Sequence, residues 1–151
     1  MEREFKIEPC KDEHLDDLIK LIKKFDKESL SEYGLEMSEN ALADMFYNCK
    51  KSGLSLVING KAVGLIAGVV TTPAHSKEQV WQEIVWYVEE RYRKYGVSLY
   101  KAMEKKLLEM GISKMVMVLM YNSKKEKLTE FYERLGYTPM ETQFIKNLKE
   151  S

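Results

Sequence analysis

The residues best suited to do chemistry lie in one short segment, between a predicted strand and a predicted helix. Its members are Arg93, Lys94, Tyr95, Gly96, Val97 and Ser98. The first turn of a helix leaves backbone N–H groups without intrahelical partners, and they carry the positive end of the helix dipole. Gly96 lets the backbone approach an anion closely, and Ser98 is small and offers a hydroxyl donor. The segment therefore predicts a site for an anion such as a pyrophosphate, although a basic strand–helix turn can also be only a turn.

The elements on either side must position this segment. Val80 to Val88 is apolar with two tryptophans and predicts a strand. Leu99, Met103 and Leu107 share one face of a helix predicted from Val97 to Met110, which Gly111 ends. Glu83 is the lone acid inside the apolar strand, and acidic side chains are seldom buried without a structural or functional reason.

The rest of the chain supplies helices and strands for one mixed sheet. We predict strands over 5–10, 54–58, 61–72, 114–120 and 138–148, helices over about 12–25, 38–52 and 125–135, and a polar loop over 26–36. Ser38 is a plausible N-cap, and Asn59-Gly60 is a strong hairpin signal. This order predicts an α+β fold with helices on both faces of the sheet, in a single domain over residues 1–151.

Composition excludes several classes of protein. Lys and Arg number 24 and Asp and Glu 24, and a net charge of zero argues against general nucleic-acid binding. No signal peptide or membrane span is recognisable, so we expect no membrane partner and a cytoplasmic protein. Cys10 and Cys49 are far apart in sequence and have no nearby histidine. His14 and His75 are isolated, and the chain has no phosphate-loop, dinucleotide, zinc-protease or serine-hydrolase motif, so we expect no metal.

Two stretches of the chain resemble a known family. Arg93 to Ser98 resembles the cofactor motif [RQ]-x-x-G-x-[GA] of the GNAT superfamily of N-acetyltransferases, with Ser98 where Gly or Ala is usual. Val88 lies five residues upstream of Arg93, as in the family, and Tyr132 to Tyr137 resembles its Tyr-x-x-x-Gly-aromatic string. The resemblance implies a mostly antiparallel mixed sheet that splays between the fourth and fifth strands.

The resemblance also implies acetyl-CoA as co-substrate and a role for each matching residue. The pantetheine arm would pair with the main chain of Trp86, Tyr87 and Val88, and the pyrophosphate would bind amides between Arg93 and Ser98. Asn122 is a weaker candidate for a cofactor contact, since Lys125 occupies the family's usual Asn spacing.

Glu83 matches the family's general base, which takes a proton from the amine. The alternatives for Glu83 are a charge at a strand edge or a buried ion pair. Tyr132 matches the general acid that protonates the leaving thiolate, and the alternative is a core residue.

The acceptor is predicted from charge alone. Acids predominate between Asp26 and Glu39, on the family's acceptor side, which favours a cationic small molecule or a peptide amine. A homodimer is left open, with Tyr47 or Tyr137 as candidate interface residues. Two other functions remain open: a non-catalytic acyl-CoA-binding regulator, and a small phosphate- or nucleotide-binding module.

Overall fold

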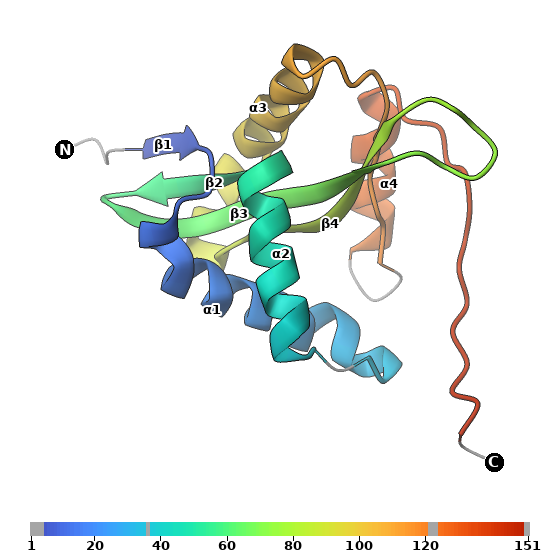
Figure 1. Cartoon of the computed structure of the whole chain (residues 1–151), viewed down its shortest axis with the longest axis horizontal. Coiled ribbons are helices and arrows are strands. Elements are labelled where there is room, and N and C mark those ends of the chain that lie inside the picture. The colour runs from blue at the N-terminus through green and yellow to red at the C-terminus, as the bar shows by residue number, and fades with distance from the viewer. Residues whose placement is uncertain (1–4, 36, 121–123, 150–151) are drawn as a thin grey trace.

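The protein is described by a computed structural model that covers residues 5–35, 37–120 and 124–149. Its centre is a five-stranded sheet with the order β1-β2-β3-β4-β5 (Figure 1). The strands are β1 (Phe5–Glu8), β2 (Gly53–Ile58), β3 (Lys61–Thr71), β4 (Val80–Val88) and β5 (Met115–Val116). Strands β1 to β4 are antiparallel to one another in sequence order, and β5 runs parallel to β4. The mixed, mostly antiparallel sheet predicted from sequence is confirmed.

The hairpin between β2 and β3 turns where the sequence predicts it. Asn59 and Gly60 both have positive φ, at 52° and 79°. Two consecutive left-handed residues are the geometry of the two-residue turn that matches strand twist.

Helices cover both faces of the sheet. On one face lie α1 (Leu15–Phe25), preceded by a 3-10 turn over Asp12–His14, and α2 (Glu39–Ser52). On the other lies α3 (Gly96–Glu109). The Ser38 hydroxyl accepts a hydrogen bond from the Ala41 N–H at 3.0 Å, so the predicted N-cap of α2 is confirmed. None of the helices in the described ranges is long and apolar enough to cross a membrane.

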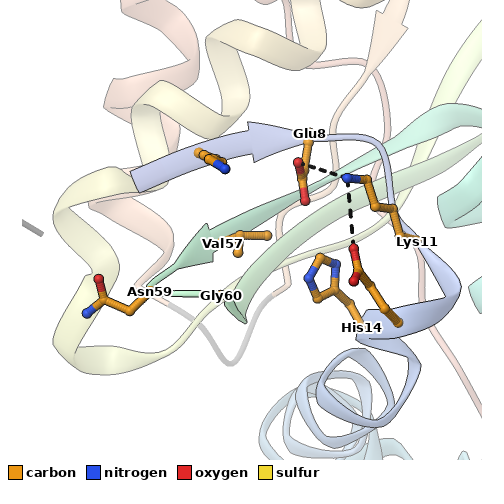
Figure 2. A pocket seen from close by; sticks show the side chains of 8 residues that line it. Glu8, Lys11, His14, Val57, Asn59 and Gly60 are labelled. Atoms are coloured by element: carbon orange, nitrogen blue, oxygen red, sulfur yellow. Dashed lines mark hydrogen bonds and ion pairs between the residues drawn. The ribbon is translucent and has the colours of Figure 1, made fainter. Parts of the chain in front are cut away.

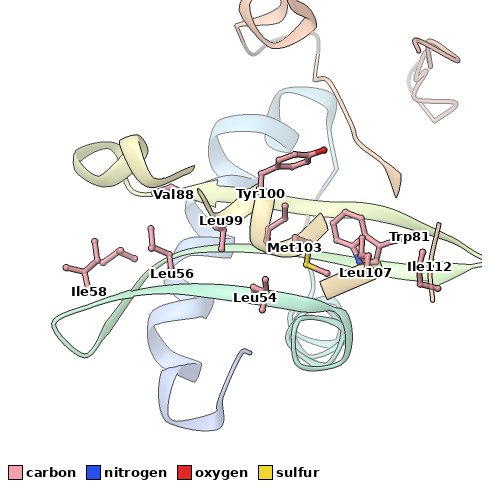
Figure 3. Packing of buried hydrophobic residues seen from close by; sticks show 12 residues of the cluster. Leu54, Leu56, Ile58, Trp81, Val88, Leu99, Tyr100, Met103, Leu107 and Ile112 are labelled. Carbon is pink, nitrogen blue, oxygen red and sulfur yellow. The ribbon is translucent and has the colours of Figure 1, made fainter. Parts of the chain in front are cut away.

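Two apolar clusters sandwich the sheet, because successive side chains of β4 point to opposite faces. Val85 and Tyr87 pack with α1 and α2, whereas Trp86 packs on the α3 side. Val88 belongs to the α3-side cluster that Figure 3 shows. On the α1–α2 side Cys10 and Cys49, distant in sequence, form a disulfide with a Cα–Cα distance of 5.9 Å.

The predicted loop after α1 is wrong. Asp26–Leu30 forms a π-helical turn and Ser31–Tyr33 a 3-10 turn, and Gly34 ends the path with φ of 73°. Polar composition suggested a loop, but no glycine or proline interrupts the helical path before Gly34.

Two predicted strands are also largely wrong. Of 114–120 only Met115–Val116 pairs with β4, and 138–148 forms no strand at all. A strand needs a hydrogen-bonded neighbour. In the described sheet β5 is the last strand, and its pairing with β4 ends at Val116. Helix α4 (Lys125–Arg134) forms as predicted, one residue shorter.

Candidate active site

Two predicted catalytic side chains, from different elements, meet at the backbone of one residue. Glu83 lies on β4, Tyr132 lies on α4, and Val118 follows β5 in the chain. The Val118 N–H donates to the Glu83 Oε2 at 3.3 Å. The Tyr132 hydroxyl donates to the Val118 carbonyl oxygen, also at 3.3 Å. A carboxylate and a phenol are therefore held next to each other where β4 and β5 separate.

The separation of the two strands creates this position. β4 and β5 pair only at Trp81 with Met115 and at Gln82 with Val116. Glu83 is the next residue of β4, so its side chain lies where the ladder stops. On the other side of β4 the register shifts beside Gly68, the partner of Glu83. A Cβ on Gly68 would overlap the Gln82 carbonyl and the Trp81 indole, so only glycine fits beside this part of β4.

Burial makes Glu83 an unusual carboxyl group. Its side chain is 9% exposed, and desolvation raises its pKa to about 8, against the lowering effect of the Val118 N–H. Among the ion pairs of residues 5–35, 37–120 and 124–149, none involves Glu83. The alternative of a buried ion pair therefore has no support within these ranges. A carboxyl with a pKa near neutrality can both take up and release a proton.

Tyr132 is held as a neutral phenol. Burial is the main cause that raises its pKa, followed by the charge of Glu83 and then by Tyr137. The ring of Tyr132 also packs against Phe131 and Tyr137, at centroid distances of 5.7 and 5.3 Å. Tyr132 is thus a core residue and a hydrogen-bond donor at once, and its proton remains available at neutral pH.

A cluster of aromatic side chains between β4, α3 and α4 supports Tyr132, and its central residue, Tyr100, was not predicted from sequence. The Tyr100 hydroxyl donates to Glu104 at 2.8 Å and is 2.7 Å from the Tyr137 hydroxyl. The Trp86 ring lies 5.8 Å from that of Tyr100. Tyr100 has the spacing of an ordinary core residue of α3, and Val118 acts through its backbone, so sequence carries no signal for either.

The predicted anion site forms an exposed surface. A 3-10 helix over Glu90–Tyr95 joins β4 to α3, and no side chain among the described residues caps the start of α3. Lys94, Val97 and Ser98 are exposed, but the Gly96 N–H donates to the Arg93 carbonyl, so the first amide of α3 already has a partner. Gly96 has an ordinary helical φ of −59°, and an added Cβ would lie 4.0 Å from the Trp86 ring. Glycine is therefore not demanded by backbone conformation there.

Arg93 is held against the end of β4. Its Nε donates to the Val88 carbonyl at 3.0 Å, and its guanidinium lies 5.6 Å from the centre of the Tyr87 ring. It also lies 4.0 Å from Glu28, whose carboxylate accepts from the Tyr87 hydroxyl at 3.0 Å. Glu28, predicted on the acceptor side, thus contacts the predicted cofactor arginine.

A cavity of about 460 Å³ lies next to this contact and carries both signs of charge. Its lining residues are Lys24, Lys27, Glu28, Tyr87, Glu89, Glu90 and Arg93.

The structure shows where most of the remaining predicted cofactor residues lie but does not test their roles. Trp86, Tyr87 and Val88 lie beyond the last residue of β4 that pairs with β5. Their main-chain contact with a pantetheine arm stays a prediction. Asn122 lies outside the described residues.

A second cavity, of about 220 Å³, lies beside the start of α1 and the β2–β3 hairpin (Figure 2). Ligand atoms of Glu8, Glu13 and His14 lie within 4.8 Å of one another there, and the buried Nδ1 of His14 has no hydrogen-bond partner among the described residues. The Lys11 ammonium lies 3.3 Å from Glu8 and 3.9 Å from Glu13, so the two carboxylates already share a cation.

Comparison with known proteins identifies the class. A model of the acetyltransferase (GNAT) family matches residues 15–137. The chain therefore belongs to the GNAT acetyltransferases, a family of acyltransferases. A comparison by sequence with curated proteins gives no match.

Solved structures share the fold. The aminoglycoside N-acetyltransferase AAC(6')-Iy in complex with CoA superposes with a TM-score of 0.70 at 13% identity, covering 99% of this chain and 97% of its own. The aminoglycoside acetyltransferase meta-AAC0020 from an uncultured soil metagenomic sample, in complex with trehalose, gives 0.68 at 16% identity, with 96% and 97% covered. The ribosomal-protein-alanine N-acetyltransferase from Brucella melitensis biovar Abortus 2308 gives 0.65 at 13% identity, with 97% and 99% covered.

Proposed function

We propose that this acetyltransferase transfers an acetyl group from acetyl-CoA to a primary amine, with Glu83 as general base and Tyr132 as general acid. The observation that carries the proposal is the shared contact with Val118: the Val118 N–H binds Glu83 and the Val118 carbonyl binds Tyr132. A base and an acid that bind the same residue lie close enough to act in one reaction, the base on the attacking amine and the acid on the leaving thiolate.

The reaction follows from the state of each group. An ammonium substrate gives one proton to the Glu83 carboxylate, and the freed nitrogen attacks the thioester carbonyl carbon. A C–N bond forms, the C–S bond breaks, and the departing thiolate takes the Tyr132 proton. The second proton lost by the nitrogen restores the phenol, so the products are an amide, a free thiol and one released proton.

The donor would bind along β4 and the start of α3. The exposed junction with Lys94 and Ser98 suits a pyrophosphate, and the stretch of β4 at Trp86–Val88, which pairs with β3 but not with β5, suits an amide-bearing arm. CoA in the structure of AAC(6')-Iy supports this choice of donor.

A small cationic amine is the acceptor that the chain favours. Glu28 and Glu32 lie on the helical turns after α1, near the end of β4. The aminoglycoside acetyltransferases among the similar structures support a small amine, and the ribosomal-protein enzyme keeps a peptide amine open. Neutralising Glu28, Glu32 and Glu36 together should raise KM for the true acceptor, and an unchanged KM would reject a role for this charge.

The test is an amine panel with acetyl-CoA, followed by release of free thiol. Turnover with at least one amine, lost in Glu83→Gln, is the expected result. Tight CoA binding by calorimetry without turnover of any amine would instead identify a non-catalytic acyl-CoA-binding regulator. Binding of ATP but not CoA would identify a nucleotide-binding module.

A further inference from the structure

The cavity beside the start of α1 brings together three side chains that could hold a metal ion. Ligand atoms of Glu8, Glu13 and His14, one from each residue, lie within 4.8 Å of one another. Glu8 ends β1, whereas Glu13 and His14 lie in the 3-10 turn that precedes α1. In Figure 2 the side chains of Glu8 and His14 point toward one another. The sequence predicted no metal, because nothing in it indicates that Glu8 lies beside the pair Glu13-His14.

His14 is the buried member of this group. Its side chain lines the cavity, yet the residue is only 5% exposed, and its Nδ1 has no hydrogen-bond partner among the described residues. The large majority of buried side-chain polar atoms in proteins have a partner, so a buried imidazole without one needs an explanation. Neutral imidazole is the commonest metal ligand in proteins, and a cation bound by the ring would explain why the protein offers the ring no partner.

A protein cation already lies between the two carboxylates. The Lys11 Nζ lies 3.3 Å from the Glu8 Oε2 and 3.9 Å from the Glu13 Oε1 (Figure 2). Lys6 lines the same cavity, so two lysines balance the charge of the two carboxylates. The Lys11 side chain is 49% exposed on a flexible stem, and exposed ion pairs of this kind contribute little to stability. The position between the carboxylates therefore favours positive charge, and Lys11 can leave it for water.

We propose that Glu8, Glu13 and His14 bind a divalent transition-metal cation of the Zn²⁺ type, which displaces the Lys11 ammonium. The ligand set decides the class of ion: Zn²⁺ takes imidazole nitrogen and carboxylate oxygen, whereas Mg²⁺ and Ca²⁺ take oxygen ligands. Three protein ligands leave the fourth tetrahedral position to a water molecule.

The distances fit after a small movement. Ligands at about 2.0–2.2 Å from one tetrahedral Zn²⁺ lie about 3.3–3.6 Å from one another, so the three groups must close by on the order of 1 Å. The Glu13 side chain is 68% exposed and can turn toward the other two without disturbing the core.

The bound ion would join the end of β1 to the start of α1. Its ligands include neither Glu83 nor Tyr132, and the cavity shares no lining residue with the cavity beside Arg93. An ion that binds the folded chain and not the unfolded one stabilises the folded state in proportion to its occupancy. The role of this site is therefore structural and does not depend on the proposed acetyl transfer.

The first test is calorimetric titration of the full chain with zinc chloride. No reductant is added, so the disulfide between Cys10 and Cys49 stays closed and supplies no thiolate to the metal. We expect one Zn²⁺ to bind per chain and the Tm to rise with Zn²⁺ concentration. Magnesium chloride at the same concentrations should produce neither effect.

Glu13→Gln removes an exposed ligand without touching the core. It should weaken Zn²⁺ binding at least tenfold, because losing even a residue that only orients a metal ligand costs about 10–100-fold in affinity. Glu39→Gln removes the same charge from an exposed position at the start of α2 and should bind Zn²⁺ as the wild type does. His14→Gln should also lose binding, whereas His75→Gln, at an exposed position, should keep it. Because His14 is buried, Glu13→Gln carries the test if His14→Gln fails to fold.

Lys11→Gln tests the displacement itself. The substitution removes the competing ammonium and leaves all three ligands, so the variant should bind Zn²⁺ more tightly than the wild type. Lys20→Gln, exposed on α1, removes the same charge away from the carboxylates and should leave the affinity close to that of the wild type. Unchanged or weaker binding in Lys11→Gln would place the metal elsewhere.

The other outcomes are equally decisive. A wild type that binds no Zn²⁺ overturns the proposal, because Lys11 is then the only cation that the carboxylates accept. Binding that survives Glu13→Gln with full affinity overturns it too. Magnesium binding as tight as zinc binding would show that the imidazole is not a ligand. None of these measurements uses activity, so the result is independent of the proposed function.

Discussion

Two neighbouring regions, the interior of β4 and the turn that follows it, differ sharply in their exposure to water. Glu83 lies in the interior of the strand, buried, with its pKa raised to about 8 by desolvation. The turn after Val88 leads to an exposed helix end with Lys94 and Ser98 in solvent. The two regions teach that one strand can lead from a water-excluded carboxyl group to a solvent-exposed turn, which is the arrangement that the proposed proton transfer and the proposed binding of a charged cofactor would need.

The strongest test of the buried region is Glu83→Gln. Loss of a positioned general base is expected to lower kcat/KM by about 10²–10⁴-fold, with CoA affinity unchanged. The measurement is steady-state thiol release, with calorimetry for CoA. Glu78→Gln is the matched control, because Glu78 is a surface acid paired with Lys114 outside the site and should keep full activity.

The wild-type pH profile sharpens the same point. The base must be ionised to act, so kcat/KM should rise with pH and level off above about 8. A profile with its midpoint near the ordinary value for a glutamate would show that Glu83 is not the base.

Glu83→Gln is expected to stabilise the fold relative to the wild type at alkaline pH. The folded pKa of Glu83 lies above the unfolded value, so the folded state keeps a proton that the unfolded chain has lost. This group's contribution to stability is complete below the unfolded pKa and is lost as pH rises toward about 8, by at most about 1.4 kcal/mol per pH unit. Urea unfolding at several pH values should show Glu83→Gln gaining on the wild type as pH rises. Parallel pH curves for the two proteins would contradict the burial of this carboxyl.

The exposed junction is tested by Arg93→Ala with Lys94→Ala. Hydrogen bonds to charged groups contribute about 1.5–3 kcal/mol, so CoA affinity should fall by about 10–100-fold. In the wild type, CoA affinity should also weaken with added salt. Calorimetry measures both, and Lys101→Ala with Lys105→Ala, exposed on α3, is the control for loss of positive charge. Equal losses of CoA affinity in the two double variants would show that the overall positive charge binds CoA, rather than a specific site at Arg93 and Lys94.

Tyr132→Phe should have a smaller effect than Glu83→Gln. A thiol with a pKa near 8.5 is a fair leaving group already, so kcat should fall by about tenfold with little change in CoA binding. Tyr47→Phe, exposed on α2, is the control for removal of a hydroxyl. A loss of activity in Tyr132→Phe as large as that in Glu83→Gln would show that the two groups contribute equally to the reaction.

A region away from both sites provides the baseline. Ser38→Ala removes the hydroxyl that accepts from the Ala41 N–H at the start of α2 and should lower the free energy of unfolding by about 1 kcal/mol. Activity per folded molecule should not change. A fall in kcat would instead couple the start of α2 to the site.

Local chemistry was readable from sequence. The bounds of β4, the Asn59-Gly60 hairpin and the Ser38 cap follow from residue types and short-range spacing, and the structure confirms them. The family also followed, because motifs of adjacent residues carry the resemblance, and the match of the family model confirms it.

Contacts between distant segments were not readable. Glu83 and Tyr132 meet at Val118 because β4 and β5 separate there. No local sequence pattern predicts where the hydrogen bonds between two strands that are distant in sequence will end. The contact of Glu28 with Arg93 has the same origin.

The sequence by itself thus determined most of the helices and strands and the family of the protein, because these depend on neighbours along the chain. Only the tertiary structure decided that Glu83 is desolvated, that Tyr132 lies beside it, and that 138–148 pairs with none of the strands in the described part of the chain. Burial and strand pairing depend on what packs alongside, and that is settled when the chain folds.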